Sequence, residues 1–193
     1  FFDPEWMFGI KEGFDIVIGN PPYVEHKKLK HISLELKNRY LTYSGTADLY
    51  VYFYENGIIN LKENGSLYFI TSNKFVKTSY GANLRRHFLN FTIKELIDFT
   101  NVHVFEALVA SCIFGITRKP SLRNMIKIAF ADDSLCDFSD LNTFIDENKF
   151  FLPQQILSEG IWQLENETKL ALKNKIENIV SDEKWMVDVD NMI

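Results

Sequence analysis

An asparagine, two prolines and a tyrosine follow one another in the stretch FDIVIGNPPYVEH, residues 14–26. The Asn20 side-chain oxygen and the Pro21 carbonyl are hydrogen-bond acceptors, and the two proline rings make the backbone around them rigid. Tyr23 adds a flat aromatic face on which a planar ring can stack. Two acceptors beside an aromatic plane suit a planar substrate that carries an exocyclic NH₂ group.

The chemistry that suits this set of groups is nucleophilic attack by that amine. Such an amine is a weak nucleophile because its lone pair is delocalised into the ring. Hydrogen bonds from its two N–H groups to Asn20 and the Pro21 carbonyl favour a pyramidal nitrogen, whose lone pair then points at an electrophile. The proton can leave after the attack, so the predicted site needs neither histidine nor cysteine.

A strand is predicted to hold this motif in place. Residues 14–19 are rich in β-branched side chains and end in Gly19, which predicts a buried strand. Two prolines cannot extend a strand, so the motif begins where the strand ends. Open α/β sheets bind their ligands at the carboxyl ends of strands, which is where the motif lies.

The rest of the chain alternates between predicted strands and helices, which indicates an α/β sheet with helices on both faces. We expect the last two strands, joined by a short connection, to form an antiparallel edge of a mostly parallel sheet. Gly65 is expected to be the left-handed C-cap of the helix at 47–61. The predicted strands after the first are residues 66–72, 93–99, 111–118 and 125–131. The predicted helices are residues 47–61, 82–89 and 167–180, the end of HKKLKHISLELKNRY, and FSDLNTFIDENKFF.

The charge of the chain allows only local contacts with an anionic partner. Its 193 residues carry a formal net charge of −5, which does not indicate a nucleic-acid binder. Lys27, Lys28 and Lys30 directly follow the motif and are candidates for contacts with phosphates, although a solvated helix face would look the same. Arg85 and Arg86 are weaker candidates for the same role.

The cysteines and the apolar segments indicate where the protein works. Cys112 and Cys136 have no zinc-type spacing to the four histidines, so we expect two free thiols and no metal site. No signal peptide is visible, and the longest apolar run, near residues 107–116, is shorter than the ~20 residues of a membrane span. We therefore expect a cytoplasmic protein that has no contact with a membrane.

Asn-Pro-Pro-Tyr after a strand resembles the catalytic motif of the S-adenosylmethionine-dependent DNA amino-methyltransferases of the N6-adenine class. Two further stretches, ADLYVYFYENGIINLKENGSLYFITSNKFV and HVFEALVASCIFGIT, resemble later segments of that family and occur in the same order. The stretch EGFDIVIGNPPYV, with a Trp a few residues upstream, is most similar to type IIG restriction-modification enzymes. The resemblance covers about residues 1–165 and implies the Rossmann-like sheet of class I methyltransferases.

The resemblance also implies a role for individual residues. Asn20 and Pro21 would hold the amine of an adenine flipped out of double-stranded DNA, and Tyr23 would stack on that base. Phe105 would be the second aromatic wall, although a Phe in such a loop is often a core residue. The adenine ring of S-adenosylmethionine would pack against two more residues, Pro22 and Phe53, of which Phe53 could equally be a core residue of its helix.

The sequence departs from the family upstream of the motif. The family's glycine-rich cofactor loop and its acidic cofactor ligands precede this strand, whereas residues 1–13 contain no glycine-rich turn. We therefore expect the C-terminal half of the methyltransferase sheet, inactive by itself and able to self-associate through the open edge of strand 14–19. Residues 1–150 would be the catalytic half, and residues 151–193 a connection and the start of a target-recognition domain.

Two other functions stay open at this point. Protein methyltransferases that act on the glutamine side-chain amide also use Asn-Pro-Pro-Tyr, because that amide presents an NH₂ group beside a carbonyl. An interaction module that has kept the motif without the cofactor half would not be an enzyme. The long insertion between Tyr23 and Asp48, and the continuation past residue 150, favour DNA as the substrate.

Overall fold

The computed structural model describes residues 4–102, 104–105, 110–120, 123–135, 137–165 and 175. The chain divides into two compact units, Phe1–Gln163 and Leu164–Ile193, and the first contains every strand among the described residues. No helix in the described ranges is both long and apolar enough to cross a bilayer. Apart from residue 175, the predicted helix at 167–180 lies outside the described residues, and so does Cys136.

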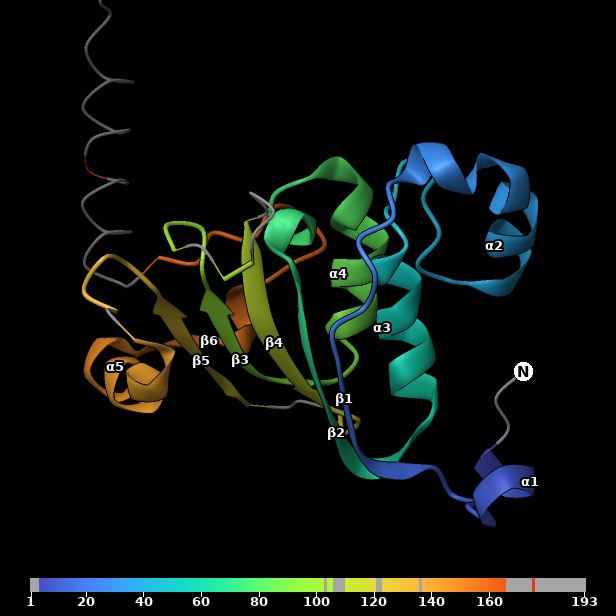
Figure 1. Cartoon of the computed structure of the whole chain (residues 1–193), viewed down its shortest axis with the longest axis horizontal. Coiled ribbons are helices and arrows are strands. Elements are labelled where there is room, and N and C mark those ends of the chain that lie inside the picture. The colour runs from blue at the N-terminus through green and yellow to red at the C-terminus, as the bar shows by residue number, and fades with distance from the viewer. Residues whose placement is uncertain are drawn as a thin grey trace, which may run out of the picture. The chain divides into compact units, whose positions relative to one another are not determined.

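The described strands form one six-stranded sheet in the order β1-β2-β4-β3-β5-β6 (Figure 1). β1 is parallel to β2, and β3 is parallel to β5. β4 is antiparallel to both of its neighbours, and β6 is antiparallel to β5. The strands are β1 (Phe14–Gly19), β2 (Leu61–Ser72), β3 (Thr92–Asp98), β4 (Ser111–Thr117), β5 (Met125–Phe130) and β6 (Phe150–Pro153).

The predicted fold class is confirmed, with one correction to the strand order. All five predicted strands are present, four of the six described strands run in one direction, and β6 is an antiparallel strand at the edge. The prediction that the strands at 111–118 and 125–131 pair with each other is wrong, because β3 lies between them. Two strand spacings are only about 10 Å, so even a short connection can pass over one strand.

The described helices include every helix predicted within these residues and one short helix near the N-terminus that was not predicted. They are α1 (Pro4–Phe8), α2 (Ser33–Arg39), α3 (Tyr50–Ile59), α4 (Ala82–Phe88) and α5 (Leu141–Asn148), and a 3-10 helix, η1 (His26–Ile32), precedes α2. The prediction that Gly65 caps α3 is wrong, because Asn60 is the C-cap and Gly65 lies within β2. A Cβ at Gly65 would lie 2.6 Å from the Phe14 carbonyl oxygen, so the glycine allows β2 to approach β1 closely.

Both faces of the sheet are covered by helices. Phe114 of β4 packs against Tyr54 of α3 and Phe88 of α4, with ring centroids 5.8 and 4.5 Å apart. The preceding residue, Ile113, points to the opposite face, where it packs in a cluster that includes Phe144 of α5. The aromatic cluster against α3 and α4 therefore forms one core layer, and the mixed aliphatic and aromatic cluster under α5 forms the other.

β1 differs from the buried strand that the sequence predicted. It is an edge strand of the described sheet, with β2 as its neighbour. The side chains of Ile16 and Ile18 are 60% and 77% exposed, and both residues line a hollow that α3 also borders. The expectation of an apolar open edge along β1 is therefore confirmed for the described residues.

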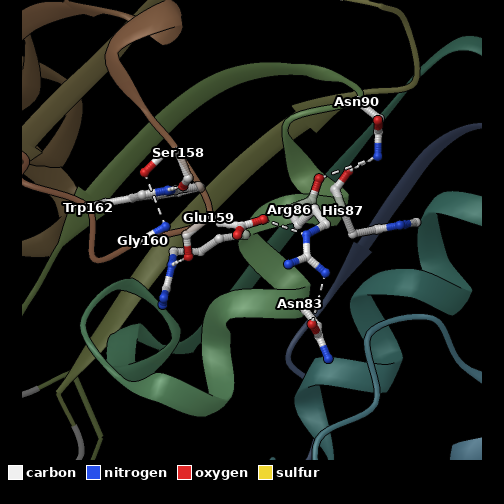
Figure 2. Close-up of polar contacts among 9 residues, drawn as sticks. Asn83, Arg86, His87, Asn90, Ser158, Glu159, Gly160 and Trp162 are labelled. Carbon is white, nitrogen blue, oxygen red and sulfur yellow. Dashed lines mark hydrogen bonds and ion pairs between the residues drawn. The ribbon is translucent and has the colours of Figure 1, made fainter.

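Arg85 and Arg86 are adjacent in α4 but have opposite surroundings. The Arg85 guanidinium is buried and donates to the carbonyl oxygens of Phe75, Thr78 and Glu159. Arg86 is exposed and pairs with the Glu159 carboxylate at 2.6 Å, as Figure 2 shows. The prediction that Arg85 contacts phosphates is therefore wrong, because three backbone carbonyls occupy its donors.

Replacing these two arginines should separate their roles. Arg85→Met leaves three carbonyl oxygens without their charged donor, so we expect the free energy of unfolding to fall by about 2–4 kcal/mol. Arg86→Ala removes an exposed ion pair and should cost no more than about 1 kcal/mol. Urea denaturation of the chain measures both values, and equal losses would contradict this interpretation of the two side chains.

Candidate active site

The motif begins directly after β1, where the sequence analysis predicted it. Asn20 is exposed, Pro21 is buried and Pro22 is exposed. Within the described part of the chain, neither the Asn20 side chain nor the Pro21 carbonyl takes part in a hydrogen bond. Both predicted acceptors therefore lack partners among the described residues, and the Asn20 side chain is open to solvent.

The backbone that follows the motif is anchored to the segment before α3. The Leu49 N–H donates to the Val24 carbonyl at 2.9 Å, and the His26 N–H donates to Asp48 Oδ1 at 3.1 Å. Two bonds between these segments fix the position of the motif loop. Asp48 was not among the predicted site residues, because an Asp beside the start of a helix indicates a cap for that helix rather than for a neighbouring loop.

The structure brings the two predicted aromatic walls together. The ring centroids of Tyr23 and Phe105 lie 6.1 Å apart with an interplanar angle of 63°, an edge-on contact. Tyr23 comes from the loop after β1, and Phe105 from the loop between β3 and β4. The Tyr23 side chain remains 38% exposed, so part of its ring is accessible from solvent.

A buried polar layer lies beside Tyr23. Tyr54 and Thr71 share a hydrogen bond of 2.8 Å between their hydroxyl oxygens, and Cys112 is fully buried. Burial, together with the nearby Cys112, raises the pKa of Tyr23 to about 12. Cys112 is a free thiol, as predicted, and burial raises its pKa far above the ordinary value. A buried thiol that stays protonated is a poor nucleophile, which agrees with a site whose chemistry does not use cysteine.

The two residues predicted to contact the cofactor have different surroundings. Phe53 is 40% exposed on α3, so it is not a core residue. With Asn56, it lines a hollow of about 330 Å³ along β1, whose walls include Ile18 and Phe69. Pro22 is not among the residues that line this hollow. An exposed aromatic ring beside an apolar strand, with an amide close by, fits the adenine end of a nucleoside cofactor.

The predicted phosphate-binding lysines lie on η1, immediately after the motif. Lys27, Lys28 and Lys30 are all exposed, and Leu29 between them is buried and anchors the 3-10 helix. In the described ranges, none of the three lysines forms an ion pair. Their positive charge is therefore available to an anionic partner on the side of the motif.

The fold of this chain is that of the class I methyltransferases. A protein from Listeria monocytogenes that is described as a class I S-adenosylmethionine-dependent methyltransferase matches 72% of this chain with a TM-score of 0.54 and 20% identity, over 42% of its own length. The structure of a DrdV–DNA complex matches 79% of this chain with a TM-score of 0.57 and 18% identity, over 18% of that protein.

The chain belongs to the Eco57I restriction-modification methylase family, whose model matches residues 1–105, more than half of its length. The type II methyltransferase M.BstVI of Geobacillus stearothermophilus is 26% identical to it over 181 residues, or 86% of this chain. The chain spans 32% of the length of that relative, about a third.

Four tyrosines whose pKa is raised give a pH test of the structure. Burial raises the pKa of Tyr23 and Tyr52 to about 12, and raises the pKa of Tyr50 and Tyr54 well above 10. A folded-state pKa above the unfolded value stabilises the fold below pH 10, and this stability is lost as the pH rises toward 12. We expect the native chain to show less phenolate absorbance near pH 11 than the same chain in denaturant, where its eight tyrosines ionise near pH 10. Superimposable titrations of the two states, with native circular dichroism retained, would contradict the burial.

Proposed function

We propose that this chain forms the amine-binding part of an enzyme that methylates the N6 amine of an adenine flipped out of double-stranded DNA. One observation carries the proposal. Two acceptors that have no partner among the described residues, the Asn20 amide oxygen and the Pro21 carbonyl, lie at the end of β1, and Tyr23, which contacts Phe105, follows in the same loop. Membership of a restriction-modification methylase family supports the same reaction class.

Adenine suits this arrangement of groups. Its N6 amine has two N–H donors, one for Asn20 and one for the Pro21 carbonyl, and its ring is flat enough to stack on Tyr23. The N6 amine is engaged in base pairing within a duplex, so the base has to leave the stack to reach these acceptors. Phe105 now meets Tyr23 edge-on, so a base that stacks on Tyr23 would move the Phe105 ring outward and gain a second wall.

S-adenosylmethionine, when bound, supplies an electrophilic methyl group on a sulfonium. The residues of this chain proposed to hold its adenine end are Phe53 and Asn56, which line the hollow beside β1. Pro22, one residue after the acceptor carbonyl, is proposed to contact the cofactor from the motif side. The chain's own contribution to the reaction is to hold the amine, to favour its pyramidal form and to keep water from the base.

We propose double-stranded DNA as the partner and the cytoplasm as the compartment. Lys27, Lys28 and Lys30 form no ion pair with any residue that the structure describes, and they lie on the element that follows the motif, where phosphates that flank a flipped base would pass. DrdV, a protein of the same fold, has been solved in complex with DNA. Type IIG organisation, with residues 1–150 catalytic and residues 151–193 leading to a target-recognition domain, completes the proposal. β6 pairs with β5, so the first part of the second range packs on the catalytic sheet.

The amine clamp can be tested in the full-length protein. Asn20→Ala removes one acceptor from a nitrogen that must change its hybridisation, so we expect single-turnover methyl transfer to DNA to slow by about 10²-fold or more. Phosphate contacts dominate DNA affinity, so the dissociation constant should change little. Asn142→Ala, the same substitution at an exposed position of α5, is the matched control and should keep the wild-type rate. A near-normal rate for Asn20→Ala would refute the assignment.

The product of the wild-type reaction distinguishes the remaining functions. Nucleoside analysis of DNA methylated with labelled cofactor should show N6-methyladenine as the labelled product. Label in N4-methylcytosine would retain the amine clamp but refute adenine as its substrate. Label in a glutamine side chain of a protein substrate, with none in DNA, would favour the glutamine-amide alternative. No transfer to either substrate would favour the interaction module.

Removing the positive charges of η1 tests whether this element contacts DNA. Replacing Lys27, Lys28 and Lys30 together with alanine should weaken DNA binding for all sequences and lower the salt slope by about 0.9 for each lysine that contacts a phosphate. The matched control replaces Lys94, Lys119 and Arg123, which line a groove at the opposite end of the strands, so the charge change is identical. Equal effects of the two triple variants on affinity and salt slope would contradict a DNA contact specific to η1.

A further inference from the structure

The loop that carries Phe105 connects two neighbouring antiparallel strands. β3 ends at Asp98 and β4 begins at Ser111, and the pairing of these strands continues one step further through the Phe99 N–H and the Ser111 carbonyl at 2.9 Å. The two ends of this long loop therefore lie close together at the carboxyl end of the sheet, beside the end of β2.

One residue contacts both ends of this loop. The backbone N–H of Asn73, the first residue after β2, donates to the carbonyl of Ala110 at 3.1 Å. Its side-chain Nδ2 donates to Asp98 Oδ2 at 2.8 Å and to Thr100 Oγ1 at 2.7 Å. Asn73 thus joins the last residue of the loop to its first residues, although it belongs to neither strand that the loop connects.

The contact at the beginning of the loop is strengthened by a buried charge. Asp98 is 8% exposed, and its Oδ1 accepts hydrogen bonds from the backbone N–H and the hydroxyl of Thr100. Hydrogen bonds to an ionised carboxylate are about twice as strong as bonds between neutral groups. A buried carboxylate that loses a donor pays a desolvation cost, so the Asn73 amide is a strong restraint on this turn.

The segment between this turn and Phe105 is packed against the core. Val102 and Val104 pack on the cluster under α5 that contains Ile97 and Phe144. Phe105 follows at once and meets Tyr23 at 6.1 Å between ring centroids. The position of Phe105 therefore depends on two restraints, the apolar contacts of the two valines and the hydrogen bonds of Asn73.

We propose that Asn73 is a positioning residue of the active site, which holds the Phe105 loop so that the second aromatic wall stays within reach of Tyr23. This inference rests on the proposed function, because a wall for a flipped base has a purpose only where a base is bound. Asn73 acts through Phe105 and need not touch the substrate. Its loss lets the Phe105 ring occupy a wider range of positions, so the base is held in the reactive geometry for less of the time.

The test compares variants of the full-length protein on target DNA. Asn73→Ala is expected to slow single-turnover methylation by about 10- to 100-fold, the scale of a misplacement of about 1 Å in an active site. DNA and cofactor affinities should stay within about twofold of the wild-type values, since neither the lysines of η1 nor the hollow beside β1 involves this loop. When 2-aminopurine replaces the target adenine, its fluorescence in the complex with Asn73→Ala should differ from its fluorescence in the complex with the wild-type protein.

A double-mutant cycle with Phe105→Ala tells a positioning role from a general loss of stability. If Asn73 acts through Phe105, adding Asn73→Ala to Phe105→Ala should slow methylation by less than about twofold further. Asn90→Ala is the matched control, because the Asn90 side chain also donates to two acceptors, the carbonyls of Arg86 and His87 (Figure 2). It should keep the wild-type rate even where its melting temperature falls as far as that of Asn73→Ala.

Each outcome decides between the two proposals. Multiplicative effects in the cycle, or a wild-type rate for Asn73→Ala, would overturn the positioning role and leave the proposed function intact if Asn20→Ala still slows methylation by about 10²-fold or more. Loss of activity in Asn90→Ala equal to that in Asn73→Ala would also overturn it, because instability alone would then explain both. Failure of the wild-type protein to methylate adenine would instead refute the proposed function.

Discussion

The proposed acceptors of an amine have to be held in place without using up their own hydrogen-bonding capacity. Backbone and amide acceptors usually find partners within the protein. Here the Asn20 amide and the Pro21 carbonyl have none among the described residues, whereas Val24 and His26, a few residues on, are bonded to the segment before α3. The prolines provide rigidity that needs no hydrogen bond, so the acceptors stay both fixed and free.

The antiparallel strand in the middle of the sheet determines what surrounds the site. β4 lies between β2 and β3, and its buried Cys112 lies near the Tyr23 ring. Phe114, two residues further along the same face, is part of the aromatic layer against α3 and α4. One strand thus contributes both to the surroundings of the proposed base site and to the core that supports the helices.

The sequence predicted the elements well, because strands and helices of this fold have local signatures. Residues 14–19 are rich in β-branched side chains, and the two prolines of the motif mark the end of β1. The pairing of β4 and β5 was predicted wrongly, since a short connection limits the distance between two strands but does not make them neighbours. Gly65 was predicted to be a helix C-cap because glycine is common after the end of a helix. In the structure it lies within β2, where the lack of a side chain allows the backbone of β1 to approach closely.

The candidate site was predicted as far as its motif extends. Asn20, Pro21, Tyr23 and Phe105 follow from residue type and from resemblance, and the structure brings the two rings together. Asp48 and the buried guanidinium of Arg85 bond to the backbone of distant segments, and Asn73 bonds to one distant carbonyl and to two distant side chains. Such bonds depend on the tertiary fold and leave no pattern near the residue that makes them, so an arginine bonded to carbonyls looks in sequence like an arginine available to phosphate.

The order of the strands has a consequence for how proteins with this fold can diversify. Tyr23 and Phe105 follow β1 and β3, which are separated by β2 and β4, so their loops start about 14 Å apart across the sheet. This span is fixed by the spacing of hydrogen-bonded strands, which side-chain substitutions do not alter. Loop lengths, surface charges and attached segments can therefore drift between lineages while the width between the two anchoring points is inherited unchanged. The spacing of the strands therefore sets the distance between the two loops, and substitutions of the aromatic residues act within that distance.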